Sequence, residues 1–422
     1  MKKIATVMTA GLLVVCLAAS SVMAGGYQLN LLGQRQIAMG HTGMGMPLDV
    51  ATIGMNPGGL AALDHTGILL GSNATFISTV YRAPAPSSYT AATDSDLRTP
   101  FGIYAGFDTP VSNLRAGLGV YTPYGNSLRW EEGWKYRFML REISLTAIFI
   151  QPTLSYNIND RIGIGAGFIF AYGAVNLQRD LPVTDQDGEF GLVELDGTTT
   201  AMGFNVGVYG KVNDMISLGV AYRSQVDMSV EGGDADFNVP VSLTPNFPPG
   251  NKFDATLPLP AVLSIGLGIK PTDNIRLNLD ANLTFWSAYE SLKFDFETET
   301  AAVQSFDDPR NFNDRWIFRI GTEVDATDWL QIRLGSYYDP SPVDEGYITP
   351  ETPDVDRIGI SGGFGVEITP RLGLNASLLV VTSSLREQSE QSAIDAGTIG
   401  KVPVGEFRTL AFIPGVSLQY TF

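Results

Sequence analysis

The amino-acid sequence predicts an all-β fold, a transmembrane antiparallel β-barrel of about 14 strands with an N-terminal plug, or hatch, inside its lumen. Apolar and polar residues alternate along most of the chain after residue 66, tight turns alternate with long polar loops, and a glycine-rich apolar segment precedes the first strand. From these observations we expect a signal peptide at residues 1–24, the hatch at residues 25–65 and the barrel at residues 66–422.

The first 24 residues have the pattern of a secretory signal. Lys2 and Lys3 form a basic start, an apolar stretch follows, and small residues up to Ala24 form a cleavage site. The apolar stretch is shorter than the ~20 residues that a membrane-spanning helix needs, so we expect cleavage rather than a permanent anchor. The only cysteine, Cys16, lies in this stretch, so disulfides and thiolate metal sites are not expected in the mature chain.

The segment 25–65 is apolar and rich in glycine but has neither a strand nor a helix period. It is too apolar for a free tail, and its glycines, with Pro47 and Pro57, disfavour long regular elements. It therefore needs a cavity, which the lumen of a barrel provides. We expect its large apolar residues and one Asn-Pro pair to contact the ligand or gate its path: Leu29, Leu31, Met39, Met44, Met46, Ile53, Asn56 and Pro57.

The barrel is predicted from the two different faces of the later segments. Within residues 275–285, Leu277 and Leu279 point one way, while Asn278 and Asp280 point the other. An apolar face of this kind recurs through most of the remaining chain without helices to cover it, so lipid must cover it. The predicted strands span residues 66–82, 99–109, 112–122, 141–158, 161–179, 198–213, 215–231, 257–271, 274–297, 311–326, 329–340, 355–369, 371–386 and 404–422.

The connections between these strands are of two kinds. Short turns such as Asn159-Asp160 and Asn213-Asp214 interleave with long polar loops, for example near residues 123–140 and 232–256. This asymmetry is typical of outer-membrane barrels, with short periplasmic turns and long external loops. The chain ends on Phe422, which resembles the signal read by the bacterial outer-membrane assembly machinery. We therefore expect localisation to the outer membrane of a Gram-negative bacterium, in contact with its lipid and lipopolysaccharide.

The charge balance disfavours one class of partner. The chain has 44 acidic and 27 basic residues and a net charge of −17, so nucleic acid is a poor partner. The acidic loop from Asp185 to Glu189 lacks the glycine spacing of an EF-hand and is interpreted as solvated charge. Bridging of such loops to lipopolysaccharide by divalent ions stays open. No resident metal site or cofactor is predicted.

Several short motifs occur in an order that resembles the FadL-type family of outer-membrane transporters for long-chain fatty acids and other hydrophobic compounds. Asn56-Pro57-Gly58 stands where that family has an Asn-Pro-Ala motif in its hatch, with glycine in place of alanine. The other landmarks are Tyr222-Arg223-Ser224, Leu257-Pro258, Trp286-Ser287, Asp339 to Val343 and Pro353 to Arg357. Each motif is weak alone, but the ordered set extends over essentially the whole mature chain.

The resemblance implies passive transport through a barrel whose hatch rearranges, with a lateral opening at a kinked third strand. In this chain the third predicted strand carries Gly117 and Gly119 and is followed by Pro123, so these residues are the candidates for the opening. The alternative is that both glycines only make space for the hatch.

Three arginines with lumen-facing parity are candidates to bind a ligand carboxylate: Arg276, Arg319 and Arg333. Each can equally pair with lumen acids such as Asp280 or Glu323, and this structural role is favoured for any one of them. A neutral apolar substrate therefore also fits the sequence.

Catalysis is not predicted. Gly359 to Gly363 match the G-x-S-x-G pattern of serine hydrolases, but this stretch lies in a predicted strand and no histidine follows it. The two histidines, His41 and His65, belong to the hatch region and are interpreted as ordinary polar residues. The sequence thus favours a passive transporter for hydrophobic compounds, with a general diffusion porin and a structural or adhesive barrel as alternatives.

Overall fold

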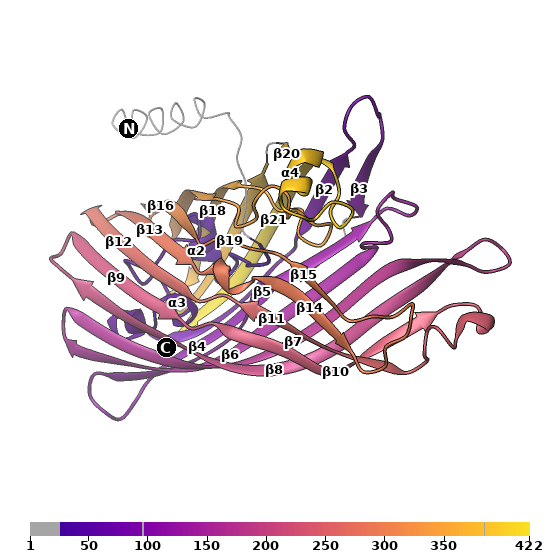
Figure 1. Cartoon of the computed structure of the whole chain (residues 1–422). Helices are drawn as coiled ribbons and strands as arrows, with labels where there is room; N and C mark the ends of the chain where they lie inside the picture. The colour runs from indigo at the N-terminus through magenta and orange to yellow at the C-terminus, as the bar shows by residue number, and fades with distance from the viewer. Residues whose placement is uncertain (1–25, 95–96, 384) are drawn as a thin grey trace.

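The computed structural model describes residues 26–94, 97–383 and 385–422, which form a closed antiparallel barrel of 14 wall strands around the hatch (Figure 1). The predicted signal peptide, residues 1–24 with Cys16, lies outside the described residues. The barrel closes where β1 (Gly67–Asn73) pairs with β21 (Gly405–Thr421) on one side and with β4 (Phe101–Asp108) on the other. Within the described ranges, no helix is long and apolar enough to cross a membrane.

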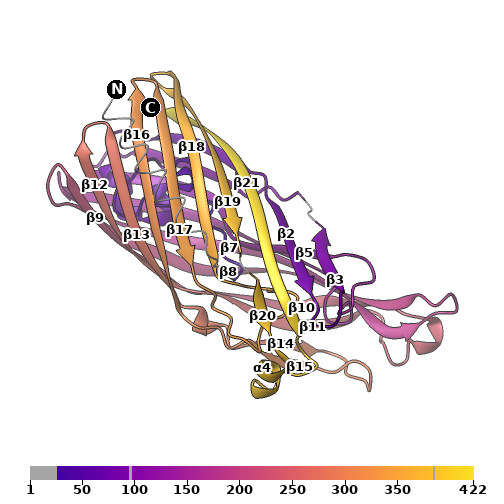
Figure 2. The same cartoon turned by 90° about the horizontal axis from the view of Figure 1, so that it is seen from above.

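The wall strands follow one another in chain order around the barrel (Figure 2). Besides β21, the strands that run as single elements are β5 (Leu114–Trp130), β6 (Glu142–Asn159), β7 (Ile162–Thr184), β8 (Phe190–Lys211), β17 (Leu330–Asp339) and β18 (Arg357–Thr369). The others consist of two elements each: β1 with β2 (Phe76–Arg82), β3 (Thr90–Asp94) with β4, β9 (Ile216–Arg223) with β10 (Val226–Asn238), β11 (Asn251–Leu259) with β12 (Val262–Thr272), β13 (Ile275–Thr284) with β14 (Ser291–Phe296), β15 (Phe306–Pro309) with β16 (Arg315–Thr327), and β19 (Leu372–Thr382) with β20 (Arg386–Gln388). Short helical turns lie in the connections: η2 (Val241–Leu243), η3 (Trp286–Ala288) and α4 (Glu390–Asp395).

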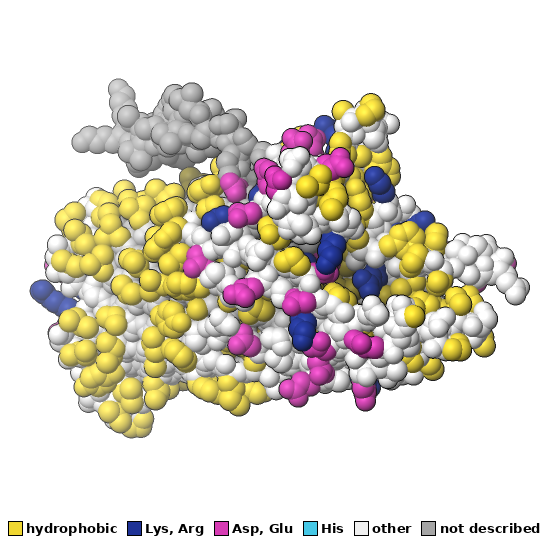
Figure 3. Space-filling view, in the orientation of Figure 1, with side chains coloured by type: hydrophobic (Ala, Val, Ile, Leu, Met, Phe, Trp, Pro, Cys, Tyr) yellow, Lys and Arg dark blue, Asp and Glu magenta, His cyan; other side chains and the backbone are white. Residues whose placement is uncertain are grey.

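The predicted alternation of the wall is confirmed. On β13, Leu279 is 36% exposed on the outer surface, whereas its neighbours Asn278 and Asp280 are buried inside. Hydrophobic side chains cover the outer surface at the end of the barrel that carries β9, β12 and β13, and charged side chains gather toward the other end (Figure 3). This division matches a lipid-facing belt beside a water-facing rim.

The tight turns form where the sequence places them, because side-chain oxygens at their first positions accept backbone hydrogen bonds. Asn159 Oδ1 accepts from the N–H groups of Arg161 and Ile162, both at 2.9 Å. Asn213 Oδ1 accepts in the same way from Met215 and Ile216. Such Asx turns reverse the chain with few residues.

At the end of the barrel opposite the tight turns, the strands are longer than predicted. The expected loops at residues 180–197 and 232–256 are largely strand, since β7 and β8 meet at a short turn and β10 continues to Asn238. The third strand also continues to Trp130, and the first, seventh, eighth and ninth predicted strands are each interrupted. In these extensions the alternation persists with its sense reversed, since Val193 and Leu195 are buried inside while Asp196 is exposed. Beyond the lipid belt the outer face meets water, so these segments resemble polar loops when an apolar outer face is the criterion.

The hatch folds into three short elements inside the lumen, α2 (Gln34–Ala38), α3 (Thr52–Met55) and η1 (Pro57–Ala62). Asn56 caps η1, because its Oδ1 accepts from Gly58 N at 3.1 Å, and its Nδ2 donates to the wall at Val208 O at 3.0 Å. A Cβ added to Gly58 would lie 2.6 Å from Gly207 O. Glycine in this motif is therefore required by close packing of the hatch against β8.

Candidate functional site

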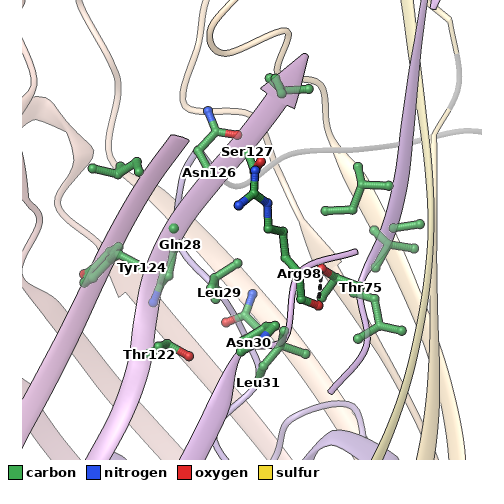
Figure 4. Close-up of a pocket in the computed structure, with 18 of the residues that line it drawn as sticks. Gln28, Leu29, Asn30, Leu31, Thr75, Arg98, Thr122, Tyr124, Asn126 and Ser127 are labelled. Atoms are coloured by element: carbon green, nitrogen blue, oxygen red, sulfur yellow. Dashed lines mark hydrogen bonds between the residues drawn. The ribbon is translucent and has the colours of Figure 1, made fainter. Parts of the chain in front are cut away.

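A cavity of about 370 Å³ lies between the start of the hatch and the wall. Figure 4 shows Leu29 and Leu31 of the hatch at this cavity, with Tyr124 of β5 on one side and the side chain of Arg98 extending along it. Most of its remaining large side chains are apolar: Ile77, Leu128, Leu145, Ile148, Leu379, Val381 and Ile413. The cavity can therefore hold an apolar molecule next to a few polar groups.

The barrel wall is interrupted beside this cavity. The β4–β5 ladder ends at the pair Gly102–Tyr121, and the β3–β5 ladder resumes at Asp94–Arg129 in the same register. In between, residues 97–100 lie outside the named strands and are bonded toward β1 and β2 instead. A stretch of the second wall strand is thus displaced from β5, and this leaves a gap at the side of the barrel.

The start of the hatch pairs with the free edge of β5 at this gap. Leu29 N donates to Pro123 O at 2.9 Å, and Gly125 N donates to Tyr27 O at 3.0 Å. The hatch thereby acts as a short added strand, which satisfies backbone groups that the displaced stretch leaves behind. The predicted residue Pro123 accepts one of these two bonds, next to Tyr124, which lies opposite Gln28.

Tyr27 is held by an aromatic cluster next to the gap. Its ring packs edge-on against Trp286 at a centroid distance of 4.9 Å and against Tyr289 at 5.9 Å, and it also contacts Tyr124 at 6.1 Å. Its hydroxyl donates to Pro258 O. The residue is 4% exposed, so it closes the space between the hatch and the strands opposite.

A second cavity, of about 90 Å³, lies on the other side of Tyr27. Its walls come mainly from β6, β7, β10, β11 and β14 and are largely apolar: Ile143, Ala147, Val175, Leu177, Met228, Val230, Phe253, Leu257, Leu259, Leu292 and Phe294. The two cavities share five lining residues, Asn126, Leu145, Thr146, Glu351 and Thr352. A single layer of side chains therefore separates the apolar interior from the gap in the wall.

Gly117 and Gly119 lie within the continuous β4–β5 ladder and not at the gap. A Cβ added to Gly117 would lie 2.6 Å from Ile53 Cδ1 and 2.9 Å from Leu60 Cδ2, and one added to Gly119 would lie 3.2 Å from Ile53 Cγ2. Both glycines thus make room for the hatch, which is the alternative stated for them above. The gap begins after Tyr121.

The predicted hatch residues divide into two groups. Leu29 and Leu31 line the first cavity. The others are buried deeper against the wall: Met39, Met44, Met46, Ile53, Asn56 and Pro57. Among them, Met44 lines a small cavity together with His41, whose Nε2 accepts from Leu32 N at 3.2 Å. These deeper residues fasten the hatch and do not line the 370 Å³ or the 90 Å³ cavity.

Two of the three predicted arginines bind a buried acid. Glu323, with a fully buried side chain, contacts Arg276 at 2.9 Å, Arg333 at 2.6 Å and the hatch residue Arg35 at 2.6 Å. Arg35 binds both carboxylate oxygens, and its second contact, from Nε, is 2.7 Å. The favoured structural role thus fits Arg276 and Arg333, which tie the hatch to β13, β16 and β17.

Arg319 also contacts the hatch. Its Nη2 donates to Asn30 Oδ1 at 2.9 Å, its Nε donates to Asn282 Oδ1 at 2.8 Å, and its guanidinium lies 5.0 Å from the centre of the Tyr337 ring. Arg276, Arg319 and Arg333 are absent from the described lining of the 370 Å³ and 90 Å³ cavities beside the wall gap, although Arg319 lines a separate, more open pocket of about 560 Å³ together with Asp280 and Tyr337. A carboxylate in either of the two cavities beside the gap would not meet them.

Sequence reasoning missed Tyr27, Arg35, Asn126 and Glu351. Arg35 did carry a signal, because it is the only Lys or Arg in residues 25–65 and a lone cation in an apolar segment must find an acid. The other three are ordinary residue types for their segments, and only the folded barrel brings them together. The Gly359–Gly363 stretch lies within β18 as expected, and its Ser361 Oγ accepts from the hatch at Gly40 N at 2.9 Å.

Comparison with known proteins gives consistent matches over nearly the whole chain. The family model described as "Outer membrane protein transport protein (OMPP1/FadL/TodX)" matches residues 15–422. A "47 kDa outer membrane protein" of Pasteurella multocida is 25% identical over 383 residues, which cover 85% of this chain and 87% of that protein.

Solved structures match the fold. A Pseudomonas aeruginosa FadL homologue superposes with a TM-score of 0.80 at 19% identity, over 94% of this chain and 100% of that one. The toluene transporter TbuX of Ralstonia pickettii gives a TM-score of 0.69 at 16% identity, over 93% of this chain and 100% of that one. At these identities the likeness concerns the plugged barrel architecture.

Proposed function

The chain belongs to the OMPP1/FadL/TodX family of outer-membrane transport proteins, and from this premise we propose that it takes up long-chain fatty acids or similar hydrophobic compounds passively. It is an outer-membrane protein, and the proposal makes it a transporter without catalytic activity. Contacts with lipopolysaccharide, and with the assembly machinery through Phe422, belong to the same proposal.

The observation that carries the proposal is the sequence of spaces beside the hatch. From the interior outward, these are the apolar 90 Å³ cavity, a layer of side chains shared by both cavities, the 370 Å³ cavity and the gap in the wall. An apolar molecule gains ~0.8 kcal/mol for each CH₂ group kept out of water, so this path is favoured over release into a wet lumen.

The proposed exit is lateral and lies near the third wall strand. It is placed between Tyr121 and Arg129 of β5, with Pro123 inside the opening, since Gly117 and Gly119 lie on the continuous side of the ladder. The hatch residues Tyr27 and Leu29 close this exit by pairing with β5. Their release would open the path from the cavity to the lipid.

A general porin and a structural or adhesive barrel are the competing functions. A porin needs an open, water-filled lumen, whereas residues 26–63 occupy the lumen here and are mostly buried. A structural barrel has no need for an apolar cavity that adjoins a wall gap.

The decisive test combines conductance with uptake. Purified protein in planar bilayers should carry little steady ion current, while cells that express it should accumulate labelled hydrocarbon or oleate faster than cells without it. A variant that lacks residues 25–63 but keeps the signal should still assemble, since the wall strands lie downstream, and should conduct strongly. Large currents from the wild type would favour a porin, and low conductance without uptake would favour the structural barrel.

A further inference from the structure

Glu351 occupies the boundary between the two cavities. It is the one charged side chain among the described residues that line the second cavity, and it also lines the first. Its backbone oxygen accepts from Asn126 Nδ2 at 2.7 Å, which ties the segment between β17 and β18 to β5 at the wall gap. A molecule that moves from one cavity to the other must pass this residue.

The Glu351 carboxylate is incompletely satisfied. Its Oε1 lies 3.9 Å from Arg310 Nη2, which is an ion pair but too long for a hydrogen bond. Its Oε2 is buried and has no hydrogen-bond partner among the described residues. Burial lowers the pKa of Arg310, but the neighbouring Tyr289 and Glu351 outweigh that effect and raise it, so the guanidinium keeps its charge.

An ionised carboxylate can only accept hydrogen bonds, and a buried acceptor without a donor keeps its full desolvation penalty. A ligand that offers an N–H or O–H group to Oε2 removes that penalty. In the second cavity, where Glu351 is the one charged residue among the described lining, a ligand carboxylate would instead place a like charge beside it and the repulsion is poorly screened. The first cavity differs, because Arg98 and Arg357 also line it. The site therefore distinguishes ligands by the polar group that they carry.

We propose that the substrates of this path are apolar molecules with a hydrogen-bond donor, a hydroxyl or amino group, which Glu351 accepts, and that carboxylates are disfavoured. This inference rests on the transport function proposed above. Within the hydrophobic compounds of that proposal, it favours alcohols, phenols and amines over fatty acids.

The test uses three ligands with one ring size and different polar groups: p-cresol, p-xylene and p-toluate. Their binding to the full mature chain in lipid nanodiscs is measured by calorimetry, with empty nanodiscs subtracted. We expect p-cresol to bind at least about tenfold more tightly than p-xylene, which corresponds to ~1.4 kcal/mol. The carboxylate p-toluate should bind most weakly.

Glu351→Leu should abolish the preference for p-cresol while p-xylene still binds, which also shows that the variant is folded. Glu351→Gln should reduce the preference, because an amide oxygen still accepts but carries no charge. Glu345→Gln, at an exposed position of the same segment, should change nothing.

Equal binding of p-toluate and p-cresol to the wild type, or an unchanged preference in Glu351→Leu, would show that the inference is wrong while hydrocarbon binding stands. Failure of all three ligands to bind the wild type would overturn this inference, while the proposed function is tested separately by conductance and by uptake of labelled hydrocarbon or oleate.

Discussion

The two parts of the hatch are attached to the barrel by different forces. Residues 33–63 are fastened by buried side chains, above all Arg35 on Glu323 and Asn56 on β8. Residues 26–32 are held by two backbone hydrogen bonds to β5, by the aromatic packing of Tyr27 and its hydroxyl bond to Pro258 O, and by hydrogen bonds near each end of the segment, from Gly26 N to Asp354 and from Arg319 to Asn30. All of these bonds have an uncharged hatch group on one side. The first part adjoins glycine-lined wall, whereas the second adjoins cavities and the wall gap.

Because of this difference we call residues 33–63 the anchor and residues 26–32 the gate. Breaking a buried ion cluster leaves uncompensated charge, so the anchor is costly to move. Backbone bonds at a strand edge can be exchanged for bonds to water, and an aromatic ring can leave its neighbours when an apolar ligand replaces it. We therefore expect ligand-dependent movement to be confined to residues 26–32.

The largest effect is expected at the anchor. Glu323→Ala removes the acid that Arg35, Arg276 and Arg333 share and leaves the buried Arg333 without its ion-pair partner, so unfolding should become easier by ~3–5 kcal/mol. Chemical denaturation in nanodiscs and trypsin cleavage at Arg35 would measure this. Glu367→Ala, at an exposed position of β18, is the matched control. Equal stability of the two variants would contradict the anchor.

Filling the first cavity should block transport without loss of the barrel. A Cβ on Gly125 would lie 3.3 Å from both Leu145 O and Leu29 Cδ1, so the ring of Gly125→Phe is expected to occupy the cavity. Uptake of labelled p-xylene should fall at least about tenfold, which corresponds to an increase of ~1.4 kcal/mol in the activation free energy of transport. Gly210→Phe, where nothing lies within 4 Å of the added Cβ, is the control. Normal uptake by a folded Gly125→Phe variant would place the exit elsewhere.

Weakening the contacts of residues 26–32 should have a smaller effect, which is measured as ion conductance. Tyr27→Ala removes the ring that packs on Trp286 and Tyr289, so the start of the hatch should leave β5 more often. Steady current through planar bilayers should rise several-fold while the barrel keeps its heat-modifiable migration. Tyr420→Ala, an outer-surface tyrosine that is 43% exposed, should conduct like the wild type. Unchanged current in Tyr27→Ala would argue against a gate at this position.

The smallest effect is expected at the rim of the anchor. The side chain of Arg276 is 20% exposed and also binds Asp325, so Arg276→Gln should cost less than ~1 kcal/mol of unfolding free energy. Arg333→Gln should cost more unfolding free energy, because the Arg333 side chain is only 2% exposed. The denaturation midpoints of the two variants show which substitution lowers stability more. The reverse order would show that burial does not set the strength of this cluster.

The wall was predictable because its evidence is local. The outward position of Leu279 and the inward position of Asn278 follow from alternation alone, and the turn at Asn159 follows from its side chain. The hatch was predictable as a body, since an apolar glycine-rich segment needs a cavity. For Gly117 the sequence left two alternatives, because glycine in a strand signals close approach or weakness without saying which. The contacts of an added Cβ with Ile53 and Leu60 favour close approach of the hatch.

The sequence by itself determined the plugged barrel and the side chains that face the lipid. Only the tertiary structure decided where the wall opens, which arginines bind Glu323 and which residues surround the cavities. Arg35 and Glu323 lie 288 positions apart, and Asn126 and Glu351 lie 225 apart. Contacts of this kind depend on the register of every strand between them, so no local pattern can contain them.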